Sequence, residues 1–148
     1  MAARWFEDLP VGTRTEIGDY LLSREEIIEF ASRWDPYPFH VDEQAARDSV
    51  FGGLTASSCH LFAICTLLFH RDPDPIAVLA MLGKDAMRFP NPARPGDRLR
   101  YRTECVEARE SRSNPERGVV TLADELCNQR GEPILTQRVS LLVARRGR

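Results

Sequence analysis

The pattern of apolar and polar residues changes about halfway along the chain. In the second half apolar and polar residues alternate, which is typical of strands that bury one face against a core. Val120, Leu122 and Leu126 share one parity, for example, and turn-forming residues such as Gly131 separate the alternating stretches. With one more alternating stretch near the N-terminus, the predicted strands span residues 13–22, 78–89, 98–108, 118–128 and 133–144.

Three segments of the first half are predicted to be helical. Ser23 and Glu26 form a capping box at the start of the first helix, which ends at Asp35 because the following proline disfavours helical backbone there. A short helical piece is predicted over residues 42–47. Residues 56–69 contain no proline, glycine or charged side chain, and a helix that is apolar on nearly every side is a buried one.

This order of elements predicts an α+β fold. One strand, a buried helix and then four consecutive strands suit an antiparallel sheet with helices on one face, wrapped around the helix of residues 56–69. At 148 residues, the chain is expected to form a single domain over residues 1–148.

Composition narrows the classes of function. Apolar residues make up 43% of the chain and charged residues 28%, as in ordinary globular proteins. A formal net charge of -2 gives no support to a nucleic-acid partner. No secretory signal is visible, and the longest apolar run is far short of the ~20 residues of a membrane span. The four cysteines lack metal-binding spacing, so they are expected to be reduced thiols of a cytoplasmic protein without a metal site.

The strongest chemical signal is a carboxylate and an imidazole five positions apart. Asp35 and His40 flank a stretch with two prolines, which excludes a regular helix and predicts a stiff loop. Such a pair can divide proton transfers between an acid and a base, and either residue could take either role. Without further information, Asp35 could equally be a residue of a helix end and His40 an ordinary loop histidine.

A second signal follows in residues 51–58. Gly52 and Gly53 permit close approach of the backbone to a ligand, and they lead directly into the apolar helix. Backbone N–H groups of Ser57 and Ser58, at the start of that helix, could stabilise a developing oxyanion. An ordinary serine-capped helix would present the same sequence. Together the two signals predict chemistry on a carbonyl compound.

These residues resemble the MaoC-like dehydratases, a hot-dog-fold group that includes the (R)-specific enoyl-CoA hydratases. Asp35, Tyr37, Pro38 and His40 fall on the family pattern of Asp, Pro and His. Residues 51–60 (FGGLTASSCH) are similar to a family block that reads FGGLIASGWH. Further similarity is found in residues 92–97 (PARPGD) and in residues 111–131, so the resemblance covers nearly the whole chain.

The resemblance implies a fold, an activity and a partner. The fold would be a five- or six-stranded antiparallel sheet around a long central helix, in a homodimer whose sheets join edge to edge. The reaction would be reversible hydration of a 2-enoyl-CoA thioester to a 3-hydroxyacyl-CoA, with coenzyme A as part of the substrate and no separate cofactor. The implied site consists of catalytic Asp35 and His40, oxyanion-binding N–H groups of Ser57 and Ser58, and substrate contacts from Tyr37, Phe51 and Gly53.

Two positions depart from the family pattern. Ser58 stands where the family usually has glycine, and Tyr37 replaces the commoner asparagine or glutamine. Neither change removes an ionisable group of the expected chemistry, so both bear on substrate choice rather than on the reaction.

Two other functions fit the same fold. Many hot-dog thioesterases use an acidic residue of the central helix, and residues 56–69 contain none, which favours the hydratase. A non-catalytic acyl-CoA-binding homologue is disfavoured by the intact Asp35 and His40 pair, although Ser58 keeps it open. His60 is expected to be a hydrogen-bonded core residue. Arginines such as Arg94 could contact coenzyme A phosphates, but arginines scattered over strands and loops are usually solvated.

Overall fold

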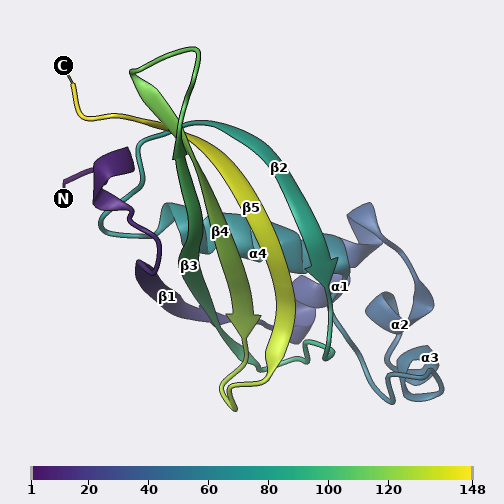
Figure 1. The fold of residues 1–148 in the computed structure, drawn as a ribbon. Coiled ribbons are helices and arrows are strands. Elements are labelled where there is room, and N and C mark those ends of the chain that lie inside the picture. Colours follow the sequence, from purple (N-terminus) through teal and green to yellow (C-terminus); the bar gives the residue numbers. More distant parts are fainter. Residues whose placement is uncertain (1, 148) are drawn as a thin grey trace.

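The computed structural model describes residues 2–147 and contains one antiparallel sheet with helices packed against it (Figure 1). The strands are β1 Arg14–Leu21, β2 Val78–Arg88, β3 Arg98–Glu110, β4 Arg117–Cys127 and β5 Pro133–Ala144. The helices are the 3-10 turn η1 Phe6–Asp8 and the α-helices α1 Arg24–Trp34, α2 Pro38–Val41, α3 Glu43–Arg47 and α4 Ser58–His70. Within residues 2–147, none of these helices has the length and apolar character needed to cross a bilayer.

The sheet has the strand order β1-β3-β4-β5-β2, with antiparallel pairing throughout. Strands β3, β4 and β5 form a central meander, while β1 and β2 occupy the two edges. Figure 1 shows α4 lying across one face of the curved sheet, with α1, α2 and α3 gathered near one end of α4. The predicted α+β class and antiparallel sheet are therefore confirmed, with five strands.

The sequence pattern located every strand to within two residues, because each inner strand buries alternate side chains. Strand β4 buries every second residue from Gly118 to Leu126. Helix α4 begins at Ser58 rather than at residue 56, since Ser57 caps it: the Cys59 N–H donates to Ser57 Oγ at 3.2 Å. The preceding residue, Ala56, is held outside the helix, where its N–H donates to Ala93 O at 3.0 Å.

The predicted loop between Asp35 and residue 42 was partly wrong. Residues 38–41 form the short helix α2, which contains His40. Pro38 occupies its first turn, where a missing N–H breaks no intrahelical bond and the fixed φ of proline suits the helix. The two prolines therefore stop α1 and start α2, and His40 is held on a helical turn instead of an extended loop.

Helix α4 is also less enclosed than its composition predicted. Leu61, Ile64, Cys65 and Leu68 are buried against the sheet and α1. Phe62 and other apolar residues on the remaining side of the helix are exposed beside the edge strand β2. One apolar side of α4 is thus left exposed by residues 2–147 of a single chain.

Candidate active site

Asp35 is held at the end of α1 by both its backbone and its side chain. Its N–H donates to Ala31 O at 2.8 Å, which closes the last turn of the helix. Ser57 Oγ donates to Asp35 Oδ2 at 2.7 Å. A side chain that is one-fifth exposed is thereby fixed at the edge of a cavity, with one carboxylate oxygen already engaged.

His40 is buried on α2 and its ring is oriented by Thr55. The His40 Nδ1 lies 2.6 Å from Thr55 O, and a carbonyl oxygen only accepts, so Nδ1 carries the hydrogen. Thr55 is tied to α2 a second time, because its N–H donates to Phe39 O at 3.3 Å. In the neutral ring, Nε2 is consequently left with a lone pair that points toward Asp35.

The distance between the two groups allows a third molecule to join them. His40 Nε2 and Asp35 Oδ2 are 3.6 Å apart, which is longer than a hydrogen bond. Contacts of this length between polar groups are commonly bridged by water. The carboxylate and the imidazole lone pair could therefore accept both hydrogens of one water molecule.

Both groups open onto a cavity of about 390 Å³. Its apolar wall includes Phe51, Leu61 and Phe89, and Tyr37 stands at the rim, 59% exposed and stacked on Phe39. Ser58, the first residue of α4, also lines it. A mainly apolar cavity with a few convergent polar groups is the usual form of a small-molecule site.

The two serines predicted to bind an oxyanion occupy different places. Ser57 is fully buried and its hydroxyl serves both Cys59 N–H and Asp35. Ser58 faces the cavity, and an N–H in the first turn of a helix has no intrahelical partner. The positive end of the helix dipole lies at the same point, so the Ser58 N–H is the donor best placed for a negatively charged oxygen.

Gly53 lies behind the cavity wall. It is absent from the residues of the described chain that line the cavity, and its carbonyl accepts from Arg94 Nη1 at 2.8 Å. A Cβ atom on Gly53 would lie 3.2 Å from that same nitrogen. The glycine therefore permits close approach of an arginine side chain, where the sequence suggested close approach of a ligand.

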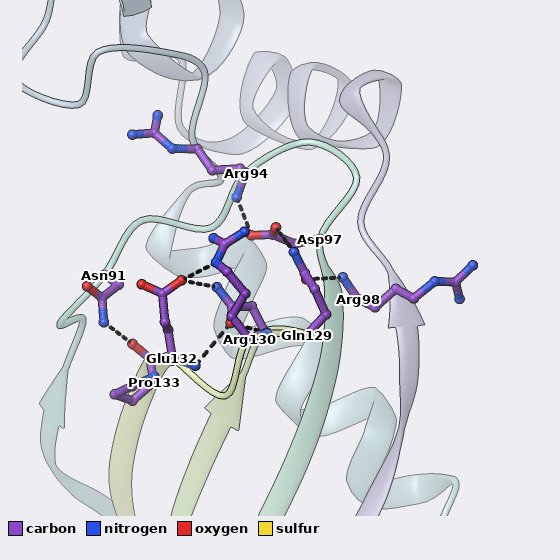
Figure 2. A network of polar contacts seen from close by, with 9 residues as sticks. Asn91, Arg94, Asp97, Arg98, Gln129, Arg130, Glu132 and Pro133 are labelled. Atoms are coloured by element: carbon purple, nitrogen blue, oxygen red, sulfur yellow. Dashed lines mark hydrogen bonds and ion pairs between the residues drawn. The ribbon is translucent and has the colours of Figure 1, made fainter.

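Arg94 is the residue whose role sequence reasoning missed. Its guanidinium also donates to Phe51 O, so it holds the loop that precedes Thr55 and α4. The backbone of Arg94 is fixed in turn by Asp97, whose Oδ2 accepts the Arg94 N–H at 2.8 Å (Figure 2). The signal was present in residues 92–97, where prolines and a glycine flank an arginine and an aspartate, but it did not identify the acceptors.

The Arg94 segment is fastened to the turn between β4 and β5 (Figure 2). Gln129 Nε2 donates to Asp97 Oδ1 at 3.1 Å, and Asn91 Nδ2 donates to Pro133 O at 2.8 Å. Residues 91–93 line the cavity, so these bonds attach one of its walls to the turn between β4 and β5 and to the start of β5. Arg98, by contrast, points outward and pairs with Asp19 at 2.8 Å.

His60 lies outside the Asp35 cavity, as expected of a core residue. Its Nε2 lies 3.0 Å from Glu26 Oε2, and its ring stacks on Phe30 at 4.5 Å. Burial lowers the pKa of this histidine. The contacts join α1 to α4 and so help to set the separation of Asp35 from the start of α4.

A larger hollow, of about 630 Å³, lies on the outer face of the sheet over β1, β3 and β4. Several of its charged side chains are paired with one another: Arg14 Nε lies 2.6 Å from Glu104, and Arg102 Nε lies 3.3 Å from Glu16. The residues that line this hollow are charged or polar apart from Ala123, whereas aromatic and aliphatic side chains wall the Asp35 cavity, which is therefore the better candidate despite its smaller size.

Similarity to known proteins identifies the family of this chain. The family model described as MaoC like domain matches residues 9–125, most of the chain, including Asp35, His40 and all of α4. The uncharacterized protein YdeM of Bacillus subtilis is 26% identical over 144 residues, which cover 94% of this chain and 98% of YdeM.

Solved structures agree in fold over nearly the whole chain. A MaoC-like dehydratase from Rhodospirillum rubrum is 36% identical, with a TM-score of 0.91 and coverage of 99% of this chain and 100% of that one. The R-hydratase PhaJ1 from Pseudomonas aeruginosa has a TM-score of 0.75 at 22% identity, with coverage of 96% and 86%, which bears on the fold alone. The predicted hot-dog fold is confirmed, and the chain belongs to the MaoC-like dehydratase family.

Proposed function

We propose that this protein catalyses the reversible hydration of a 2-enoyl-CoA thioester to a 3-hydroxyacyl-CoA. Membership of the MaoC-like family points to a hydratase or dehydratase. The observation that carries the finer proposal is the pairing of Asp35 Oδ2 with the lone pair of His40 Nε2 across 3.6 Å, at a cavity that also receives the start of α4.

In this mechanism one water molecule donates hydrogen bonds to Asp35 and His40. One of the two groups takes a proton as the water oxygen bonds to the β-carbon of the substrate. The electron pair of the carbon–carbon double bond shifts toward the thioester, which leaves negative charge on its oxygen. The group that took the proton then delivers it to the α-carbon, and the thioester carbonyl is restored. The sum of the steps is the addition of one water molecule.

The start of α4 would stabilise the enolate oxygen. The Ser58 N–H supplies a fixed donor and the helix dipole supplies a positive potential, neither of which must reorganise during the reaction. Ser57 contributes differently, because its hydroxyl holds Asp35 in place. Tyr37 and Phe51 offer aromatic surface at the cavity for the carbon chain of the substrate. Arg94 and Gly53 act as positioning residues for the Phe51 loop.

The proposal includes a homodimer. Leu79, Met81 and Leu82 project from the edge strand β2 and are each more than half exposed, next to the exposed Phe62 and Leu67 of α4. An edge strand beside an apolar patch is a pairing surface that proteins normally cover. A second copy of the chain, joined edge to edge through β2, would cover both and would lie close to Phe89 of the catalytic cavity.

Loss of enoyl absorbance on mixing purified protein with a panel of 2-enoyl-CoA thioesters tests the activity. Turnover of at least one enoyl-CoA, with no release of free thiol, is the expected result. A thioesterase would instead release thiol from saturated acyl-CoAs. That outcome is disfavoured because α4 contains no acidic residue to serve as base or nucleophile. A protein that binds acyl-CoA and changes neither signal would be the non-catalytic homologue.

A further inference from the structure

Glu26, near the start of α1, is held from two sides by side chains of other elements. His60 Nε2, in the first turn of α4, lies 3.0 Å from Glu26 Oε2. On the other side, Tyr20 Oη of β1 donates to Glu26 Oε1. A carboxylate only accepts, so His60 Nε2 carries the hydrogen of the neutral ring and donates it. Through this one carboxylate, the helix that ends at Asp35 is bound both to the sheet and to α4.

Asp35 provides a second attachment of α1 to the start of α4. Ser57 Oγ donates to Asp35 Oδ2 at 2.7 Å, nine residues after the attachment at Glu26. Apolar side chains of α1 are buried between the two attachments, but apolar packing is not directional and leaves a helix able to turn within its groove. One hydrogen bond would also permit such a turn. Two hydrogen bonds fix the direction of α1, and with it the orientation of the Asp35 carboxylate toward His40.

The imidazole of His60 is a costly way to make this attachment. The residue is 3% exposed, and its ring stacks on Phe30 with the ring planes within 7° of parallel. Its Nδ1 is buried and accepts from no group within residues 2–147. A buried polar atom without a partner costs free energy, and an apolar side chain of similar shape avoids that cost. Glu26 could be solvated without His60, because its side chain is 37% exposed. Stability alone therefore favours an apolar residue at position 60.

We propose that His60 is a positioning residue for the hydration, and that it contributes to the direction of α1 rather than to stability. His60 does not line the Asp35 cavity. It acts through Glu26 on the helix that carries Asp35. Its effect on rate rests on the proposed function, whereas its effects on stability and on the direction of α1 do not.

His60→Gln and His60→Met form a matched pair for the test. Both replace the ring by an unbranched side chain of similar length, and only glutamine keeps an N–H donor for Glu26. His60→Met should lower kcat by about tenfold or more and change KM much less, because a misplaced catalytic group slows the chemical step. His60→Gln should keep most of the activity. Equal kcat values for the two variants would contradict the proposal.

The Asp35→Asn background separates positioning from general damage. If His60 acts through Asp35, adding His60→Met to Asp35→Asn should lower kcat no further, because the effects of residues that act as a unit are not additive. A purely structural role for His60 would instead lower kcat by the same factor in both backgrounds, and that result would overturn the proposal.

The unfolding temperature should not follow the activity. His60→Met removes the unpaired Nδ1, so the unfolding temperature should stay unchanged or rise while kcat falls. A purely structural residue would show the opposite pattern, with a lower unfolding temperature and an unchanged kcat.

The direction of α1 can be measured without any turnover. Residual dipolar couplings of the backbone N–H groups of α1, scaled to those of β3 and β4, should be reduced in His60→Met and should keep their wild-type values in His60→Gln. Unchanged couplings in His60→Met would show that His60 does not direct α1. If the wild type hydrates no enoyl-CoA, the proposed function fails and the couplings still decide the role of His60.

Glu26→Ala tests the same attachment from α1 and keeps the proposal testable if the His60 variants do not fold. It removes the acceptor of both hydrogen bonds and should lower kcat as His60→Met does. Glu29→Ala, at an exposed glutamate of the same helix, is the matched control and should leave kcat unchanged. Equal kcat values in these two variants would be evidence against the attachment.

Discussion

Asp35 at its cavity and Asp124 inside the sheet are two carboxylates in opposite circumstances. Asp35 is partly exposed, held by one serine, and paired with a histidine that can take a proton. Asp124 is enclosed, held by a tyrosine and a glutamine, and has one oxygen without a donor. The first arrangement suits proton transfer to a reacting molecule, and the second encloses a carboxylate that such a molecule does not reach.

The largest effect is expected at Asp35. Asp35→Asn should lower the hydration rate by about 10²–10⁴-fold, because the amide cannot take part in proton transfer. Its thermal stability should change little, since the amide oxygen can still accept from Ser57. Rate and unfolding temperature should be measured together, with Asp48→Asn, an exposed aspartate of the same region, as the control. Retention of full activity by Asp35→Asn would contradict the proposed mechanism.

The second effect concerns the loop that supports the catalytic cavity. Arg94→Ala removes the donors to Phe51 O and Gly53 O and should lower kcat by about tenfold or more, because small displacements of positioned groups are costly in catalysis. Millimolar methylguanidinium should restore part of the activity. Arg98→Ala, which removes an exposed guanidinium paired with Asp19, is the matched control and should leave kcat unchanged. If Arg94→Ala lost stability and methylguanidinium restored no activity, Arg94 would have a structural role only.

The third effect is a pH dependence of stability that belongs to Asp124. Burial raises its pKa to about 6 from the ordinary value of 3.8, so between these values the folded protein binds more protons than the unfolded one. The free energy of unfolding should therefore fall as pH rises across this window, by an Asp124 contribution on the order of 2–3 kcal/mol. Asp124→Asn should lack this contribution in denaturant titrations at pH 4 to 7. Parallel curves for the two proteins would show that Asp124 ionises normally.

The smallest effect compares two adjacent serines. Ser57→Ala should lower the free energy of unfolding by about 1 kcal/mol, because the Ser57 hydroxyl caps α4. Activity should fall as well, since Asp35 loses its donor. Ser58→Ala keeps the N–H that faces the cavity and should change stability by less than about 0.5 kcal/mol. Equal losses of unfolding free energy in the two variants would show that the Ser57 hydroxyl does not cap α4.

The proximity of Asp35 and His40 could be predicted from the sequence because its signals are local. Asp35 and His40 are five positions apart, and the prolines that restrict the backbone lie between them. The strands could also be predicted, since the alternation of apolar and polar residues follows directly from the burial of one face. Helix α2 was missed because a four-residue helix that begins with proline has no periodic pattern to detect.

The rest of the site depends on contacts between distant residues. Arg94 reaches Phe51 O and Gly53 O across more than forty residues, and only the folded chain reveals which carbonyls it contacts. Asp124 shares the inward parity of β4, yet its place between Thr103 of β3 and Gln137 of β5 requires the strand register as well as the parity. The exposed side of α4 differs from expectation for another reason: apolar composition indicates that a surface is covered, but not whether the same chain covers it.

The fastening of Asn91 to Pro133 and of Asp97 to Gln129 has a consequence for protein synthesis. Asp35 and His40 leave the ribosome early, but the turn that supports the wall of their cavity follows nearly a hundred residues later. At typical elongation rates of about 5–20 residues per second, Asp35 and His40 are synthesised roughly 5–20 s before that support. A nascent chain arrested before β5 should therefore carry Asp35 and His40 without this support and remain inactive.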